Sequence, residues 1–203
     1  MIATQEMLGE RISAESQNGS GREVWTEAAF ESVFVQHYPR IVAVLFRIVG
    51  NRAQADELAG DVFWKAYRKA PHSDSPLEQN NLGGWLYRVA TRVGIDALRA
   101  GTRRKRYEQE AGAASYETDE ASPNSDPLAD VLREEKRRRV REALALMKPV
   151  RAQLLILRQS GLSYQELAQT LGVKPGSIGT LLARAEAEFE KHYRELYGHE
   201  EGL

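Results

Sequence analysis

Basic side chains gather at helical spacing near the middle of this 203-residue chain, where their pattern could hold a nucleic acid. Four of them lie within about 60° of one another on one helix face, and three follow directly: Arg88, Arg92, Arg99 and Arg103, then Arg104, Lys105 and Arg106. Trp85 and Tyr87 lie beside this stripe. A cationic track with aromatic rings beside it can hold a phosphate backbone and stack unpaired bases. The alternative is a solvated helix face with Trp85 packed between helices.

A helix-turn-helix pattern begins at Ser163, in the last quarter of the chain. Ser163 and Glu166 form a capping box that opens one helix, Gly172 supplies the turn, and Pro175 suits the first position of the next helix. The second helix has an apolar face and an opposite polar face: Ile178, Leu182, Ala185 and Phe189 against Ser177, Thr180, Arg184 and Lys191. Such a polar face can enter the major groove of DNA. The alternative is an αα-hairpin that only packs.

The overall composition narrows the possible functions. The formal net charge is -1, because an acidic stretch between the two basic regions cancels their charge. Cysteine is absent, which excludes disulfides, thiolate metal sites and thiol nucleophiles and fits a reducing cytosol. The four histidines do not cluster with carboxylates at metal-ligand spacing, and no phosphate-binding glycine loop occurs. We therefore expect no enzyme, no metal and no cofactor, and the sequence suggests no signal peptide and no apolar run long enough to insert in a membrane.

Apolar residues at helical spacing predict an all-α fold of two small helical domains, which a flexible acidic linker joins. We expect helices over 26–37, 41–50, 51–70, 82–100, 131–147, 150–160 and 163–171, and a last one from near Pro175. Tyr38-Pro39, Gly50, Gly101 and Pro149 are the expected breaks. Every charged residue between 107 and 130 is acidic. The domain boundaries follow: a disordered arm over 1–25, a first domain over 26–106, the linker over 107–130, a helix-turn-helix domain over 131–195 and a tail over 196–203.

Taken in order, these pieces resemble a sigma-70 family initiation factor of the small extracytoplasmic-function type. Each motif alone is weak, but the series in this order and spacing is specific. The residues that carry the resemblance are Tyr38-Pro39-Arg40, Asp56 to Arg68, Gly84 to Ala90, Ile95 to Arg99, Ala143 to Pro149 and Leu162 to Ala185.

The resemblance implies a cytoplasmic, dissociable subunit of bacterial RNA polymerase. The first domain, which corresponds to region 2 of sigma factors, would dock on the clamp helices of the polymerase core through Glu57, Leu58, Asp61, Val62, Lys65 and Arg68. It would hold the melted minus-ten element through Trp85, Tyr87, Arg88, Arg92, Arg99 and Arg103 to Arg106. The helix-turn-helix domain, which corresponds to region 4 of sigma factors, would rest on the polymerase flap and read the minus-thirty-five element through Lys174, Ser177, Gly179, Thr180 and Arg184. The linker would thread the RNA channel, catalysis would belong to the polymerase, and an anti-sigma factor would be a partner.

The sequence departs from the family pattern at a few of these positions. Many relatives have Asn where Arg92 stands and Gln where Gly60 stands. The last helix, which starts near Pro175 and would be the recognition helix, is poor in cations. Relatives often place Lys or Arg at the positions where this chain has Gly179, Leu181 and Glu186. Fewer phosphate contacts weaken the salt-dependent part of DNA affinity, and Gly179 costs the helix about 1 kcal/mol relative to Ala. We therefore expect this domain to bind weakly, to read another sequence or to rely on a partner.

Three alternatives remain open from the sequence. The first is a helix-turn-helix regulator that binds duplex DNA by itself, which leaves the helix from Asp56 to Arg68 without a role. The second is a sigma-like decoy that binds a partner or the polymerase without opening promoters. The third is a small metal-dependent nuclease that would use Asp56, Glu57 and Asp61.

Overall fold

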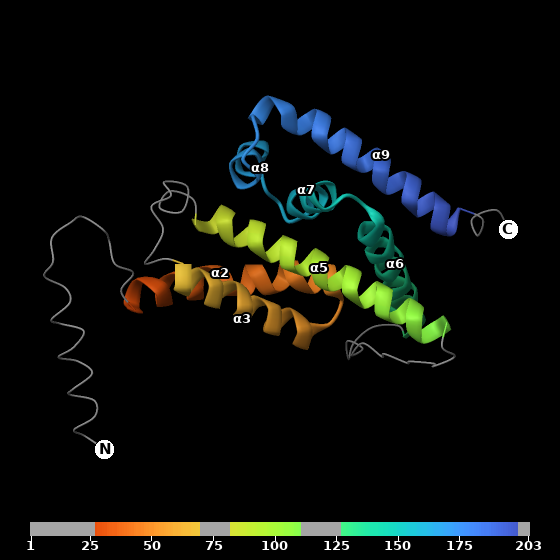
Figure 1. Ribbon diagram of the computed structural model, residues 1–203, viewed down its shortest axis with the longest axis horizontal. Helices are drawn as coiled ribbons and strands as arrows, with labels where there is room; N and C mark the ends of the chain where they lie inside the picture. The colour runs from red at the N-terminus through yellow and green to blue at the C-terminus, as the bar shows by residue number, and fades with distance from the viewer. Residues whose placement is uncertain (1–26, 70–81, 111–126, 199–203) are drawn as a thin grey trace, which may run out of the picture.

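The computed structural model describes residues 27–69, 82–110 and 127–198, and over these ranges the fold is all-helical (Figure 1). The elements are, in chain order, α2 (Glu27–Val49), α3 (Arg52–Lys69), α5 (Leu82–Glu110), α6 (Pro127–Leu146), α7 (Pro149–Gln159), α8 (Tyr164–Leu171), the short 3-10 turn η3 (Pro175–Ser177) and α9 (Ile178–Tyr197). This confirms the predicted all-α class. The predicted arm, the middle of the predicted linker and most of the predicted tail lie outside the described residues, so the domain boundaries stay predictions.

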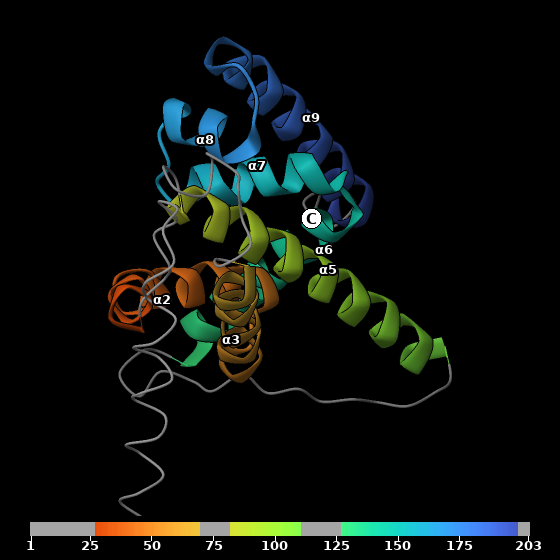
Figure 2. The ribbon, with the colours of Figure 1, turned by 60° about the vertical axis from the view of Figure 1, so that its left-hand side comes forward.

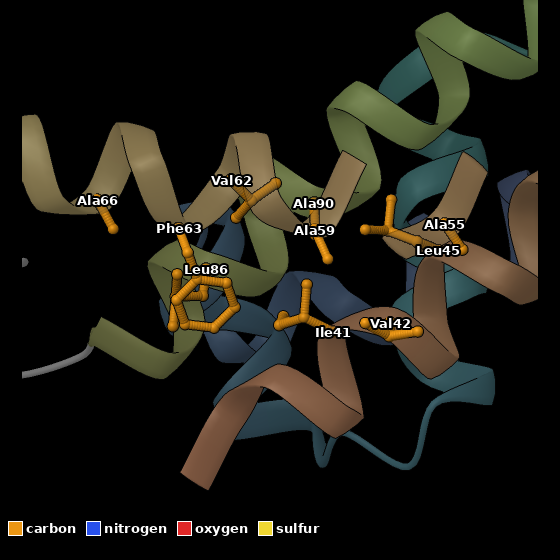
Figure 3. Packing of buried hydrophobic residues seen from close by; sticks show 10 residues of the cluster. All are labelled: Ile41, Val42, Leu45, Ala55, Ala59, Val62, Phe63, Ala66, Leu86 and Ala90. Atoms are coloured by element: carbon orange, nitrogen blue, oxygen red, sulfur yellow. The ribbon is translucent and has the colours of Figure 1, made fainter. Parts of the chain in front are cut away.

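The first domain is built from α2, α3 and α5, which enclose one apolar core (Figure 3). Ile41, Leu45 and Val62 are fully shielded from solvent, and burying each such side chain stabilises the fold by about 1.5–3 kcal/mol. Gly94 allows α5 to approach α2 closely, because a Cβ there would lie 2.9 Å from Ile48 Cδ1. The Asn51 side chain accepts a hydrogen bond from the Gln54 N–H at 2.9 Å, which confirms Asn51 as the cap of α3.

Several predicted helix bounds are wrong. Helix α6 begins at Pro127, before its predicted start at residue 131, so residues 107–110 and 127–130 of the predicted linker are helical. Helix α2 continues through Pro39, where the ring removes the hydrogen bond to the Val35 carbonyl. Both residues lie on the exposed side, where water can take the place of the missing donor. Helix α5 continues past Gly101 to Glu110. The following Arg, Lys, Gln and Glu residues are strong helix formers, and together they outweigh the cost of about 1 kcal/mol at one glycine.

Helix α2 also corrects an expectation about membranes. Its segment Phe30–Val49 is long and apolar enough, by length and composition alone, to cross a bilayer. In this structure Ile41, Val42, Leu45 and Ile48 of that segment are buried among the other helices. One side of this segment therefore packs in the protein core.

The second domain comprises α6 to α9, and its local signals agree with the sequence. The Ser163 side chain accepts from the Glu166 N–H at 3.3 Å, and Glu166 Oε2 accepts from the Ser163 N–H at 2.7 Å. This confirms the predicted capping box, and these hydrogen bonds lower the pKa of Glu166. Gly172 is left-handed at φ 69°, which confirms the predicted turn. Pro149 opens α7, and η3 precedes α9, so the last helix begins three residues later than predicted.

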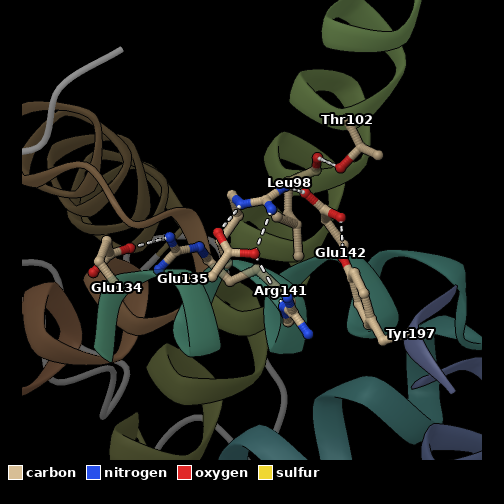
Figure 4. Close-up of polar contacts among 9 residues, drawn as sticks. Leu98, Thr102, Glu134, Glu135, Arg141, Glu142 and Tyr197 are labelled. Carbon is tan, nitrogen blue, oxygen red and sulfur yellow. Dashed lines mark hydrogen bonds and ion pairs between the residues drawn. The ribbon is translucent and has the colours of Figure 1, made fainter. Parts of the chain in front are cut away.

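Charged side chains of α6 tie that helix to the end of α9 (Figure 4). Glu135 accepts hydrogen bonds from Arg138 at 2.7 Å and Arg139 at 3.0 Å, and these lower the pKa of Glu135 to about 2. The Tyr197 hydroxyl donates to Glu142, and the Arg139 guanidinium lies 4.8 Å from the centre of the Tyr197 ring. Helix α6 therefore docks on α9 through these polar and aromatic contacts as well as through its buried residues Ala143 and Leu144.

The two domains pack against one another, which the sequence did not predict. Figures 1 and 2 show α5 between the helices of the first domain and those of the second. Val44, Ile48 and Ile95 of the first domain share one buried cluster with residues of the second, namely Leu144, Met147, Ala152, Ile156 and Ala185. This contact also explains why Thr91 and Ile95 of α5 are shielded from solvent.

Candidate nucleic-acid interface

The basic stripe on α5 divides into an exposed part and a part that contacts the second domain. Arg92 is exposed, as is the cluster from Arg103 to Arg106. Arg88 and Arg99 are only partly exposed, because they extend toward helices of the second domain. Helix α5 thus carries all of the predicted cations, but in this conformation it does not offer all of them to a ligand.

Arg99 and Arg88 donate to backbone carbonyls of the second domain. Arg99 Nε lies 3.1 Å from the Ala145 carbonyl oxygen, and its Nη2 donates to the Met147 carbonyl. Arg88 Nη2 makes a long contact of 3.5 Å to the Gln169 carbonyl oxygen, while its buried Nε has no hydrogen-bond partner among the described residues. Arg88 is therefore incompletely satisfied in this arrangement.

The two aromatic residues of the predicted DNA site are partly buried. Trp85 packs against the core of the first domain, in line with the packing alternative for this side chain. Tyr87 contacts all three apolar clusters and therefore lies where the two domains meet. Neither ring is fully open for base stacking in this conformation.

The recognition helix presents its predicted residues without obstruction. All five candidate contacts are exposed, on α9 and the turn before it: Lys174, Ser177, Gly179, Thr180 and Arg184. Ile178, Leu182 and Ala185 are buried on the opposite side, which confirms the predicted packed face. The turn and the first half of α9 therefore form a convex polar surface of the kind that enters a major groove.

The acidic half of α9 is less uniformly exposed than its sequence suggests. Glu186 and Glu190 face solvent. Glu188 instead accepts from the Lys148 N–H at 2.6 Å and pairs with Arg151. Burial alone would raise the pKa of Glu188, but these hydrogen bonds outweigh it and the pKa is lowered. Glu188 thus holds the start of α7 and does not add to the repulsion that DNA would meet.

Helix α3 displays a row of charged residues away from the core. Glu57, Asp61, Lys65 and Arg68, all predicted docking residues, are exposed. Leu58 is partly buried against the core, and Val62 is fully buried, so its side chain supports this face from within.

Sequence reasoning missed Trp64, which lies on the same side of α3. Its side chain is 58% exposed, and its ring stacks on Tyr67 with centroids 6.0 Å apart. The spacing of three residues from Asp61 and four to Arg68 was the signal that could have found it. A large exposed aromatic ring within a charged row is typical of protein interfaces.

Among the three carboxylates considered for a metal, Asp56 serves structural contacts. Asp56 accepts from Arg52 at 3.0 Å and from the Tyr38 hydroxyl at 3.4 Å. Over residues 27–69, 82–110 and 127–198, no group of three or more His, Cys, Asp or Glu residues could hold a metal ion.

The chain is a two-domain helical protein with an exposed charged face on α3, a basic helix α5 and a helix-turn-helix. Comparison with known proteins identifies the family to which such a chain belongs. Residues 33–104 match Sigma-70 region 2, and residues 137–189 match Sigma-70, region 4. The two ranges together take in more than half of the chain. The chain belongs to the sigma-70 family.

Curated relatives match at moderate identity, and for some of them, such as SigE and BldN, the chain spans less than two thirds of the relative's length. The chain is 29% identical to the RNA polymerase sigma factor CarQ of Myxococcus xanthus, covering 84% of this chain and 90% of CarQ. It is 28% identical to the RNA polymerase sigma factor YlaC of Bacillus subtilis, covering 81% and 91%. It is 26% identical to the ECF RNA polymerase sigma factor SigE of Mycolicibacterium smegmatis, covering 81% of this chain but only 61% of SigE.

One solved structure supports the same fold. CnrH, in complex with the cytosolic domain of CnrY, superimposes with a TM-score of 0.51 at 16% sequence identity and covers 82% of this chain and 88% of CnrH. At this identity the likeness concerns the fold.

Proposed function

We propose that this chain is a promoter-specificity subunit of bacterial RNA polymerase, of the extracytoplasmic-function type, that works in the cytoplasm. It binds the core enzyme, recognises the minus-ten and minus-thirty-five elements and promotes promoter melting. The observation that carries the proposal is the order of the two family regions, each with an exposed face of suitable chemistry. Catalysis belongs to the polymerase.

The docking role is assigned to α3. Glu57, Asp61, Lys65 and Arg68 are exposed, and Trp64 adds an apolar anchor in the middle of that row. Rim charges steer association and fix register, whereas a central aromatic side chain supplies much of the binding energy at an interface. We assign this face to the clamp helices of the polymerase.

The DNA roles are assigned to α5 and α9. The exposed cations of α5 suit the backbone of a melted strand, with Trp85 and Tyr87 available for stacking after rearrangement. The exposed N-terminal half of α9 suits the minus-thirty-five element. Because α9 offers few cations, its DNA affinity depends on the polymerase, which tethers it near the promoter. An anti-sigma factor is the further partner we expect.

The decoy alternative keeps one supporting observation. Glu186 and Glu190 are exposed beside the candidate DNA contacts of α9, and their charge disfavours phosphate. A chain of this kind would bind the polymerase core and still produce no specific transcripts.

Transcription in vitro separates these possibilities. The purified chain and purified core polymerase are combined on a library of genomic fragments, and transcript starts are mapped. We expect initiation at a small set of promoters that core polymerase alone does not use. Core binding without discrete starts would overturn the proposal in favour of the decoy, and tight operator binding without polymerase would favour a stand-alone regulator.

A further inference from the structure

We propose that the exposed face of α3 is also a self-association surface, through which two copies of this chain pair their α3 helices antiparallel. The second copy covers the face that is assigned to the polymerase, so self-association and core binding exclude one another. This competition rests on the proposed function, whereas self-association itself is measured on the purified chain without polymerase.

The charged side chains of α3 have no partners within the described part of the chain. Four of them are exposed and form no hydrogen bond or ion pair with residues 27–69, 82–110 or 127–198: Glu57, Asp61, Lys65 and Arg68. This holds even for Asp61 and Lys65, whose i,i+4 spacing suits a pair within the helix. Helix α6 differs, because its arginines pair with carboxylates of the same helix, as Arg138 does with Glu135 at 2.7 Å. The charges of α3 are therefore available to another molecule.

The order of these charges along α3 is self-complementary. The two carboxylates come first, at residues 57 and 61, and the two cations follow, at residues 65 and 68. When two copies of such a helix run antiparallel, the acidic half of each lies beside the basic half of the other. With the crossing point midway between residues 62 and 63, Glu57 lies level with the partner's Arg68. Asp61 then lies within about 1.5 Å of the partner's Lys65 along the helix axis, which is the rise of one residue. Opposite charges across an interface favour this pairing and this direction.

A tryptophan and a glycine supply matching shapes on the same face. At about 100° per residue, Gly60 and Trp64 project to one side of Glu57, whereas the other three charged residues project to its other side. The Trp64 side chain is 58% exposed, and Gly60 faces open space, where an added Cβ would meet no neighbouring atom within 4 Å. The antiparallel arrangement brings the Trp64 ring of each copy over the partner's Gly60, as a knob enters a hole. A large aromatic side chain at the centre of an interface supplies much of its binding energy.

Helix α3 lies where a second copy can reach it. Figures 1 and 2 show α3 at the outer edge of the first domain, and its buried side packs on α2 and α5. Tyr67, which stacks on Trp64, is 48% exposed and widens the apolar part of the face. A contact along one helix buries less area than a standard interface, so we expect a weak dimer with a Kd of about 10–100 µM.

Charge reversal tests this pairing with two variants of the full chain, each of which gives the face a single sign. One combines Glu57→Lys with Asp61→Lys, and the other combines Lys65→Glu with Arg68→Glu. Each variant alone should self-associate about tenfold or more weakly than wild type, because like charges then face one another. An equal mixture of the two should restore the dimer, since each supplies the sign that the other lacks. Sedimentation velocity measures the mass in each sample at concentrations below and above the expected Kd.

Gly60→Gln tests the shape of the face independently of its charge. The larger side chain has room on the free chain, and glutamine is a better helix former than glycine. We therefore expect this variant to unfold at a higher temperature than wild type and yet to self-associate more weakly. Glu186→Lys together with Glu190→Lys is the matched control for charge, because it makes the same change in net charge at exposed positions of α9. That control should self-associate as wild type does.

Three results would overturn the dimer through α3. They are a wild type that stays monomeric throughout, a dimer that the charge variants and Gly60→Gln retain, and a mixture of the two charge variants that stays monomeric. Binding of wild type to core polymerase is measured in parallel. Core binding together with any of these results rejects the dimer alone, whereas absence of core binding rejects the proposed function. Added core polymerase should convert the dimer into a one-to-one complex, and a complex that holds two copies of the chain would reject the competition for α3.

Discussion

The basic helix α5 and the recognition helix α9 are both assigned to DNA, yet the structure presents them in opposite ways. Helix α5 is rich in cations, and two of them, Arg88 and Arg99, are engaged by the second domain. Helix α9 is poor in cations, and its candidate contacts are all exposed. The surface with more cations is thus partly covered, while the open surface has few of them. We therefore expect the free chain to bind DNA poorly through either helix and to depend on the polymerase.

The largest expected effect comes from removing the cations of α5. With Arg88, Arg92 and Arg99 all replaced by Ala, we expect open-complex formation to fall about a hundredfold, since each lost contact costs about 1 kcal/mol. Permanganate reactivity of the melted strand measures it. Affinity for the polymerase core should stay near that of wild type, and a parallel loss of core binding would contradict the assignment of this helix to DNA.

The docking face should show the reverse pattern. Combined charge reversal at Asp61 and Lys65 should weaken core binding about tenfold or more, because complementary charges at an interface become like charges. Trp64→Ala should weaken it further through loss of an apolar anchor. Fluorescence titration against purified core measures both, with Arg40→Glu as a control on the neighbouring helix. Unchanged core affinity in the reversed variant would remove α3 from the interface.

The recognition helix should respond to added charge by a smaller amount. Glu186→Lys together with Glu190→Lys should strengthen promoter binding by the holoenzyme a few-fold, and each new phosphate contact should steepen the salt dependence by about one unit. Glu188→Lys is the informative contrast, because it breaks the contacts to Lys148 and Arg151. We expect that variant to lower thermal stability. Equal gains in DNA affinity at all three positions would contradict the orientation of α9.

The smallest effect concerns acid stability of the second domain. Hydrogen bonds from Arg138 and Arg139 lower the pKa of Glu135 to about 2 from its ordinary 4.5. A carboxylate whose pKa is lowered by folding stabilises the fold fully at pH values above its pKa in the unfolded state. This stabilisation is lost as the pH falls through the pKa in the folded state, so the contribution of Glu135 declines between about pH 4.5 and pH 2. Glu135 and its two arginine partners are in contact with solvent, so the free energy that these interactions contribute to folding is under about 1 kcal/mol. Thermal unfolding of Glu135→Gln should show a shallower decline over that range, and an identical decline would refute the assignment.

Much of the fold could be predicted from local sequence motifs, whereas the contacts between the two domains could not. Ser163 with Glu166, Gly172 and Asn51 each act within a few residues, and the structure confirms each of them. Pro39 and Gly101 were misread because neighbouring packing and helix propensity outweigh one unfavourable residue. Packing energy and helix propensity are each summed over many residues, so no short motif reveals them.

In the candidate sites, too, some features could be predicted from the sequence and others could not. The exposed faces of α3 and α9 follow from helical spacing, and only Val62 among the docking residues proved fully buried. The engagement of Arg88 and Arg99 depends on carbonyls of residues 145, 147 and 169. Backbone acceptors have no signature in the amino-acid sequence, so these contacts became visible only in the structure.

The most direct test of the account is a titration of the purified chain with purified bacterial core polymerase in the absence of DNA. The account predicts saturable one-to-one binding that the Asp61 and Lys65 reversals weaken. A chain that shows no affinity for core polymerase would contradict the account, whatever its behaviour toward duplex DNA.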